Sequence, residues 1–172
     1  MYLRRKIDDY LTQWKNNENR YPLIIKGARQ IGKTESVKHF ADRNYESVVS
    51  INFALEKQFQ MILSDGYDVE NIIKNISLID PSKKFIANRT LIIFDELQEL
   101  PDIATSLKAF KLDGRFDVIC SGSLLGINYK KIHSNSVGYK TDYEMFSMDF
   151  EEFLWGMGIS GDMIENLCGY LR

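Results

Sequence analysis

The residues from Gly27 to Thr34, GARQIGKT, have the types and spacing needed to bind phosphate. They match the pattern G-x-x-x-x-G-K-[ST], in which glycines let the backbone wrap an anion and turn successive N–H groups toward it. Lys33 can then reach the β- and γ-phosphates of a nucleotide, and the hydroxyl of Thr34 can take one coordination position of Mg²⁺. The predicted nucleotide-binding residues are Gly27, Ala28, Arg29, Gln30, Ile31, Gly32, Lys33, Thr34 and Glu35. For Arg29, contact with phosphate, contact with a neighbouring subunit and a structural role in the loop all stay open.

Two adjacent carboxylates, Asp95 and Glu96, follow the apolar run 90–94. Such a pair is also found in plain surface turns, but together with the predicted phosphate loop (residues 27–34) it suits nucleotide chemistry. We predict that Asp95 orders Mg²⁺ through its water shell and that Glu96 orients and polarises the attacking water. The chain between the two motifs is long enough for βα units, and we expect these to place the two strands side by side.

A third group of polar residues, Ser121-Gly-Ser123, follows the apolar run 116–120. A hydroxyl at this point can contact the γ-phosphate or the attacking water. We predict this sensor role for Ser121 and keep Ser123 as a second candidate. The alternative is a Ser-Gly turn that caps its own backbone. Gln98, just after the acidic pair, is either a further polar contact or a loop residue.

Each of these motifs follows a predicted strand, in a chain where predicted strands and helices alternate. Strands are predicted at 22–25, 47–53, 90–94 and 116–120, and helices at 7–14, from 33 onward, at 69–76, after 101, from 149 and at 163–171. This alternation predicts a three-layer α/β fold with a mainly parallel central sheet flanked by helices. Ligands of such sheets bind at the carboxyl ends of the strands, where Gly27, Asp95 and Ser121 are all expected. The stretch 130–142 gives no clear prediction.

Composition agrees with a globular chain of 172 residues, 44% hydrophobic and 27% charged. We predict one domain over 1–172, with 1–20 as a helical lead-in and 149–172 as C-terminal helices. No apolar run is long enough for a membrane span, and the N-terminus lacks the apolar core of a secretory signal, so a cytoplasmic location is expected. The net charge of −2 gives no support for nucleic-acid binding.

Two further groups of side chains are interpreted as core. Cys120 and Cys168 lack metal-ligand spacing, and we interpret both as reduced buried thiols. The aromatic residues near the C-terminus are also expected to be buried. They are Phe146, Phe150, Phe153 and Trp155.

Together the motifs resemble a prokaryotic AAA-type ATPase family, in which an N-terminal AAA domain precedes a C-terminal domain of unknown function. The resemblance is carried by GARQIGKT, LIIFDELQELP, ICSGSLLG and MDFEEFLW, in the expected order over most of the chain. It implies the additional-strand, conserved-glutamate type of core (AAA/ASCE), with the phosphate-loop strand between the third and fourth functional strands. It also implies that Lys33 and Thr34 bind phosphate and Mg²⁺, Asp95 binds Mg²⁺, Glu96 acts on water, and Ser121 is the sensor.

The sequence departs from this family in two places. Relatives carry Gly-Arg where this chain has Gly138-Tyr139-Lys140, so an arginine contribution from that segment is not expected. Our best candidate for an arginine donated to a neighbouring subunit is Arg115. Relatives also continue into a second domain, so we expect a truncated or reduced member of the family.

The expected function is Mg²⁺-dependent ATP binding and hydrolysis, coupled to a conformational or assembly change on an unidentified partner. The Asn-Lys-x-Asp motif of GTPases is absent, and a small-molecule kinase would not need the water-activating role of Glu96. The expected partners are ATP, further copies of the chain, and another protein or the missing domain. The alternative function is a nucleotide-dependent switch with negligible turnover.

Overall fold

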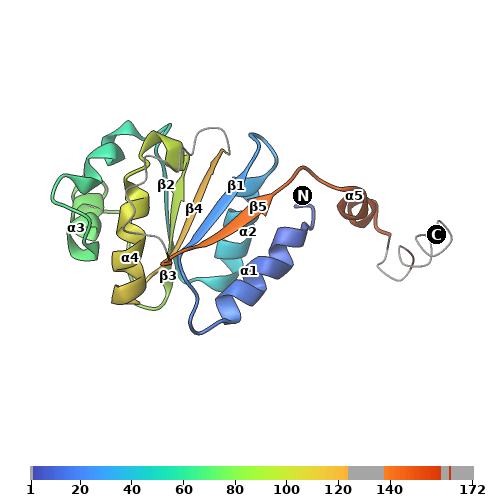
Figure 1. Ribbon diagram of the computed structural model, residues 1–172, viewed down its shortest axis with the longest axis horizontal. Helices are drawn as coiled ribbons and strands as arrows, with labels where there is room; N and C mark the ends of the chain where they lie inside the picture. The colour runs from blue at the N-terminus through green and yellow to red at the C-terminus, as the bar shows by residue number, and fades with distance from the viewer. Residues whose placement is uncertain (1, 124–137, 160–162, 164–172) are drawn as a thin grey trace.

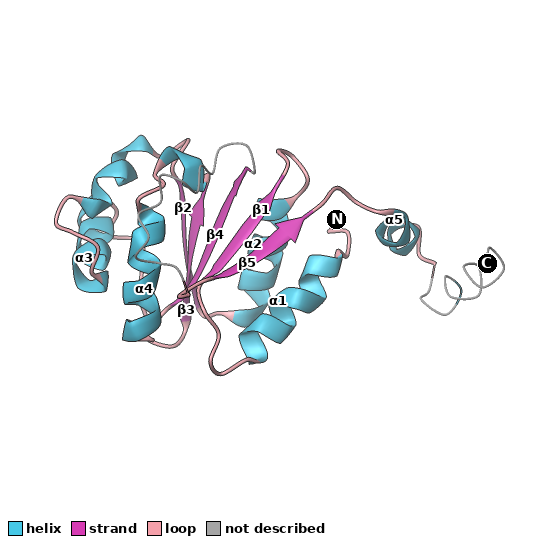
Figure 2. Cartoon of the chain, viewed as in Figure 1, coloured by secondary structure: helices cyan, strands magenta, loops and turns pink. Residues whose placement is uncertain are grey.

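The computed structural model describes residues 2–123, 138–159 and 163. In these residues a five-stranded sheet lies between two layers of helices (Figures 1 and 2). The strands are β1 (Leu23–Gly27), β2 (Ser47–Asn52), β3 (Thr90–Asp95), β4 (Asp117–Ser123) and β5 (Thr141–Met145). The α-helices are α1 (Lys6–Asn16), α2 (Lys33–Asn44), α3 (Val69–Ile79), α4 (Ile103–Asp113) and α5 (Phe150–Gly156). Short 3₁₀ helices occur at η1 (Lys57–Leu63) and η2 (Leu97–Glu99).

The strand order is β2-β3-β4-β1-β5, and every neighbouring pair is parallel. The predicted three-layer α/β fold is therefore confirmed. The expectation that β1 and β3 lie side by side is wrong, because β4 separates them. The intervening strand, β4, is the additional strand that the resemblance implied. The placement of β1 between the third and fourth strands is also wrong, because β3 and β4 pair directly and β1 lies between β4 and β5.

The two faces of the sheet are covered by different helices. α1 and α2 pack on one face, and α3 and α4 pack on the other (Figure 1). All six residues of β3 are buried, which explains why its sequence is apolar without alternation. The helices predicted at 7–14 and 69–76 are confirmed as α1 and α3, with Ile7, Leu11 and Trp14 buried in α1, and Val69 and Ile72 buried in α3.

The strand β5 was missed because its sequence, TDYEM, contains two acidic residues. It is an edge strand with only Met145 buried, so it needs no apolar run. Lys26 on the neighbouring strand β1 pairs with Asp142 at 2.7 Å across this edge. None of the helices in the described part of the chain is long and apolar enough to cross a membrane.

The expectation of an aromatic core near the C-terminus is wrong. Phe146 and Phe150 are 69% and 70% exposed, and Phe153 is 51% exposed. α5 lies beyond the edge strand, where little of the core can cover it (Figure 1), and it buries Glu152 and Leu154 instead. Asp149 and Glu152 form a capping box at the start of this helix.

The expected burial of Cys120 is confirmed. It lies in β4 with no exposed surface, and burial raises the pKa of its thiol to about 12. Such a thiol stays protonated and unreactive near neutral pH. Cys168 lies outside the described residues, as does the predicted helix at 163–171 apart from Met163.

Candidate functional site

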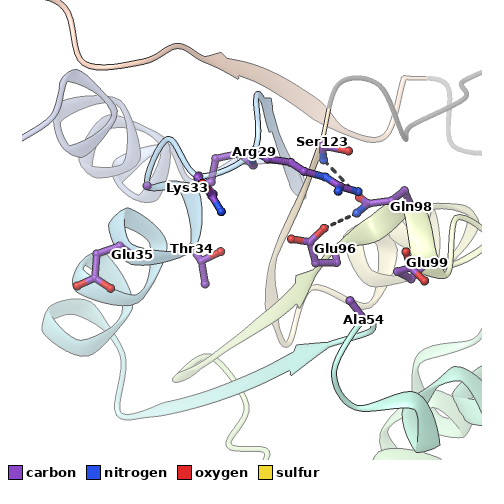
Figure 3. Close-up of a pocket in the computed structure, with 11 residues that line it drawn as sticks. Arg29, Lys33, Thr34, Glu35, Ala54, Glu96, Gln98, Glu99 and Ser123 are labelled. Carbon is purple, nitrogen blue, oxygen red and sulfur yellow. Dashed lines mark hydrogen bonds between the residues drawn. The ribbon is translucent and has the colours of Figure 1, made fainter.

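A cavity of about 610 Å³ lies at the carboxyl edge of the sheet (Figure 3). Its lining comes from the phosphate loop, the start of α2, the segments that follow β2 and β3, and the last residue of β4. The lining residues are Arg29, Gln30, Gly32, Lys33, Thr34, Glu35, Ala54, Glu96, Gln98, Glu99 and Ser123. The fold therefore brings segments that are distant in the sequence to one site, at the edge where parallel α/β sheets bind ligands.

Glycine is required at both ends of the phosphate loop. A Cβ atom at Gly27 would lie 2.3 Å from the carbonyl oxygen of Met145, so only glycine lets β1 and β5 approach this closely. Gly32 has a φ of 94°, a left-handed conformation that other residues adopt only with strain. It caps α2, which begins at Lys33 and presents its positive end to the cavity. A loop of this kind ending in a helix N-terminus suits an anion.

Lys33 folds back onto the loop that contains it. Its Nζ donates hydrogen bonds to the carbonyl oxygens of Gly27 and Ala28, at 3.1 and 2.6 Å. Burial lowers the pKa of Lys33 from its ordinary value, while the carboxylates of Glu96 and Asp95 oppose this shift. An anionic phosphate in the cavity would stabilise its charged form.

Asp95 is buried at the end of β3 and accepts three hydrogen bonds from other side chains, besides one from the N–H of Glu96 at 3.0 Å. Thr34 Oγ1 and Asn52 Nδ2 donate to its Oδ2, at 2.9 and 3.2 Å, and Ser121 Oγ donates to its Oδ1. The contact with Asn52 follows from strand register, because Asn52 and Asp95 are paired residues of β2 and β3.

Thr34 and Asp95 offer hard oxygen ligands side by side, which fits Mg²⁺. The described residues contain no group of three or more His, Cys, Asp or Glu that could hold a metal by itself. Mg²⁺ usually takes one or two protein ligands and completes its shell with water and phosphate oxygens, so Thr34 and Asp95 would be sufficient.

Glu96 turns out of β3 into the cavity. Its φ of 56° is in the left-handed region, which is uncommon for a residue other than glycine and is frequent at functional sites. This turn brings Glu96 to the cavity while its neighbour Asp95 stays buried below. The Glu96 carboxylate accepts a hydrogen bond from Gln98 Nε2, and Gln98 Oε1 accepts one from the Ser123 N–H at 3.3 Å (Figure 3).

A family model described as an AAA domain matches residues 19–154. The chain belongs to this family. Membership supports nucleotide-dependent activity in general and agrees with the arrangement of the cavity. Comparison with curated proteins returns no match.

Solved structures with a similar fold include two of Drosophila ORC, one bound to DNA and one bound to AT-rich DNA and Cdc6. The first is 13% identical with a TM-score of 0.51, and the match covers 84% of this chain and 93% of that one. The second is 13% identical with a TM-score of 0.50, covering 83% and 56%. A DNA replication initiation factor is 13% identical with a TM-score of 0.51, covering 89% and 51%. At this identity the likeness shows the fold alone, and this chain spans about half the length of the last two.

The AAA domain places most of the predicted site residues on the cavity, but not all of them. Of the phosphate loop, Gly27, Ala28 and Ile31 do not line it, and Arg29 extends from the loop toward Gln98 (Figure 3). Ser121 is buried behind Asp95, while Ser123 lies on the cavity wall.

Two residues whose hydrogen bonds support the site were missed from the sequence, in addition to the lining residues Ala54 and Glu99. Asn52 bonds to Asp95, and the signal was its place at the end of a predicted strand on the same edge of the sheet. Arg5, which bonds to the phosphate loop, gave no sequence signal, because its partner Ile31 is distant along the chain.

Arg115 lies just before β4, at the edge of the sheet opposite to the cavity. Its guanidinium is held by Asp113 at 2.7 Å and by Glu70 at 2.5 Å, and the hydrogen bond with Asp113 is the main cause of its raised pKa. Arg115 therefore does not reach the cavity of its own chain. Its role toward a neighbouring copy stays a prediction.

Proposed function

We propose that this AAA domain binds Mg-ATP and hydrolyses it, coupling hydrolysis to a conformational or assembly change on a protein partner. The observation that carries the proposal is the 2.9 Å hydrogen bond between Thr34 and Asp95, with Lys33 and Glu96 on the adjoining cavity. These groups match what phosphoryl transfer to water needs: a phosphate cradle, a cation site and a carboxylate for the water.

Each side chain has a role that follows from its position. The loop N–H groups and the Lys33 ammonium would bind the β- and γ-phosphates, and Thr34 and Asp95 would hold Mg²⁺. The ion would neutralise the charge of the phosphate oxygens. Glu96 would orient the attacking water and accept its proton. Asn52 and Ser121 would keep Asp95 in place through their hydrogen bonds.

Self-association is part of this proposal. Of the described residues that line the cavity, only Arg29 is an arginine. An arginine finger typically contributes roughly 10³–10⁵-fold in rate, so a second copy that supplied one would increase turnover. Arg115 is the candidate donor, and its ion pairs with Glu70 and Asp113 would have to open first.

The alternative is a nucleotide-dependent switch with negligible turnover. The bond between Glu96 and Gln98 favours it, because the amide fixes one oxygen of the carboxylate and so restricts how Glu96 can orient a water. In that function, nucleotide occupancy rather than hydrolysis would signal to the partner.

Phosphate release from Mg-ATP distinguishes the two functions. We expect turnover by the parent and a loss of about 10²–10⁴-fold in Glu96→Gln, with ATP still bound. The matched control is Glu99→Gln, which removes the charge of another cavity carboxylate that is paired with Lys57 at 2.9 Å. Because assembly is proposed, the rate per molecule should fall on dilution of the protein. Equal rates in the two variants would refute the role of Glu96, and a parent that binds ATP without turnover would favour the switch.

A further inference from the structure

Arg5 immediately precedes α1, and its guanidinium is almost completely buried, with the residue 7% exposed. Its Nη1 donates to the carbonyl oxygen of Ile31 at 2.8 Å, and its Nη2 donates to the carbonyl oxygen of Phe146 at 2.9 Å. Its Nε lies 3.1 Å from Glu152 Oε1. One side chain thus joins the phosphate loop, the segment after β5, and α5. Figure 1 shows the N-terminus beside the end of β5, where the chain leaves the sheet toward α5.

The bond to Ile31 acts on the phosphate loop itself. The Ile31 carbonyl and the Gly32 N–H belong to one planar trans peptide, in which the two groups point in opposite directions. Holding the carbonyl on Arg5 therefore sets the direction of the N–H of Gly32, a residue that lines the cavity. The backbone is left-handed on both sides, with φ of 62° at Gln30 and 94° at Gly32. Such a loop needs an anchor of this kind to stay in one conformation.

At its other end, Arg5 is paired with a buried carboxylate. Glu152 is 4% exposed, its Oε1 accepts the Lys6 N–H at 2.7 Å, and its Oε2 accepts the Asp149 N–H at 3.0 Å. The bond from Lys6 holds α5 against the N-terminus of α1, and the bond from Asp149 belongs to the capping box of α5 itself. A buried charge is costly without its partner, so the positions of Arg5 and Glu152 depend on each other.

We propose that Arg5 is a positioning residue that links nucleotide occupancy of the phosphate loop to the packing of α5. The inference rests on the proposed function and adds a means of regulating it. A phosphate that accepts the Gly32 N–H favours the peptide orientation that Arg5 already holds, and so strengthens the contact of Arg5 with Glu152. Because linkage is reciprocal, loosening α5 weakens nucleotide binding. α5 carries the exposed Phe150 and Phe153, so occupancy would also control an exposed apolar surface.

The first test is amide hydrogen exchange of residues 150–156, with and without Mg-ATP. We expect Mg-ATP to slow exchange several-fold in the parent, and to leave it unchanged in Arg5→Lys, because lysine lacks the planar fork that reaches three partners. The matched control is Arg4→Lys. Arg4 also contacts α5, over the Trp155 ring at 4.6 Å, but its hydrogen bond goes to Asp9 and not to the loop. The control should behave as the parent does. Equal slowing in Arg5→Lys and the parent would overturn the proposal.

The second test is calorimetric titration with Mg-ATP. Arg5→Lys and Glu152→Gln should each weaken Mg-ATP binding by about tenfold. The double variant should lose little more affinity than either single variant, because the two substitutions remove the same coupling. If Arg5→Lys does not fold, Glu152→Gln alone tests the coupling. Glu152 does not line the cavity, so its substitution can change affinity only through its contacts with Arg5 and α1. Parental affinity in Glu152→Gln would overturn the coupling and leave the proposed function intact. A parent that does not bind Mg-ATP would refute the proposed function itself.

Discussion

The centre of the sheet and its β5–α5 edge are stabilised by different interactions. In β3 every residue is buried, and Phe94 packs between Phe53 and Phe110, with ring centroids 5.6 and 6.3 Å away. At the edge, β5 buries only Met145, and α5 exposes aromatic rings while burying Glu152 against Arg5. The centre is held by non-directional apolar burial, and the edge by directed polar bonds.

This difference affects function. Apolar burial at the centre gives the site a rigid floor, in which Asp95 is fixed by hydrogen bonds from three side chains. The exposed ion pairs at the edge, those of Lys6 with Asp149 and Glu151, have alternative partners in water and can be exchanged at lower cost. The centre is therefore suited to chemistry, and the edge is suited to changing its packing.

The largest expected difference between the two regions is in stability. Phe94→Ala should lower the free energy of unfolding by about 3–5 kcal/mol, because it empties a fully buried site in the core. Phe150→Ala, at a residue 70% exposed, should change it by less than about 0.5 kcal/mol. Chemical denaturation of both variants gives the comparison. Similar losses in the two variants would show that α5 is packed as tightly as the core.

A smaller effect is expected within the site. Lys33→Ala should weaken Mg-ATP binding by about ten- to a hundredfold, the loss for one charge-assisted contact of about 1.5–3 kcal/mol. Lys38→Ala, an exposed lysine on the same helix, is the matched control and should bind as the parent does. Calorimetric titration checks both. Parental affinity in Lys33→Ala would refute the assignment of the phosphate loop.

The smallest effect is a dependence of ATP affinity on pH. Burial lowers the pKa of Lys33 in the free protein, although Glu96 and Asp95 oppose this, and a bound phosphate would raise it. The contact between the Lys33 ammonium and the phosphates is fully present below the pKa that Lys33 has in the free protein. Its contribution to affinity is lost as pH rises through that value toward the pKa of Lys33 in the bound protein, since binding then requires Lys33 to take up a proton.

Titrations with Mg-ATP between about pH 7 and about pH 10 should therefore show affinity falling at the alkaline end, near the range where lysines titrate. Lys33→Ala should lose this dependence. If the variant and the parent changed in parallel, another group would be responsible.

Much of the fold was predictable because its signals are local. The stripe of α3 and the apolar run of β3 each reflect burial along one element, and burial selects residue types at neighbouring positions. The strand β5 could not be found in this way, since an edge strand with Asp142 and Glu144 buries too little to leave an apolar run. The exposed rings of α5 were also misassigned, because apolar character predicts burial only when a partner surface is available.

The sequence by itself predicted a phosphate loop at 27–34. That prediction depends on consecutive residues, with glycine where the backbone needs a left-handed turn at Gly32 and a lysine and hydroxyl directly after it. It also determined that Asp95 and Glu96 end a buried strand. Only the tertiary structure decided the strand order, with β4 between β1 and β3, because buried parallel strands have similar sequences. It alone also brought Asn52 to Asp95 and Arg5 to Ile31. Such contacts join residues far apart in the chain, and their geometry depends on how whole elements pack.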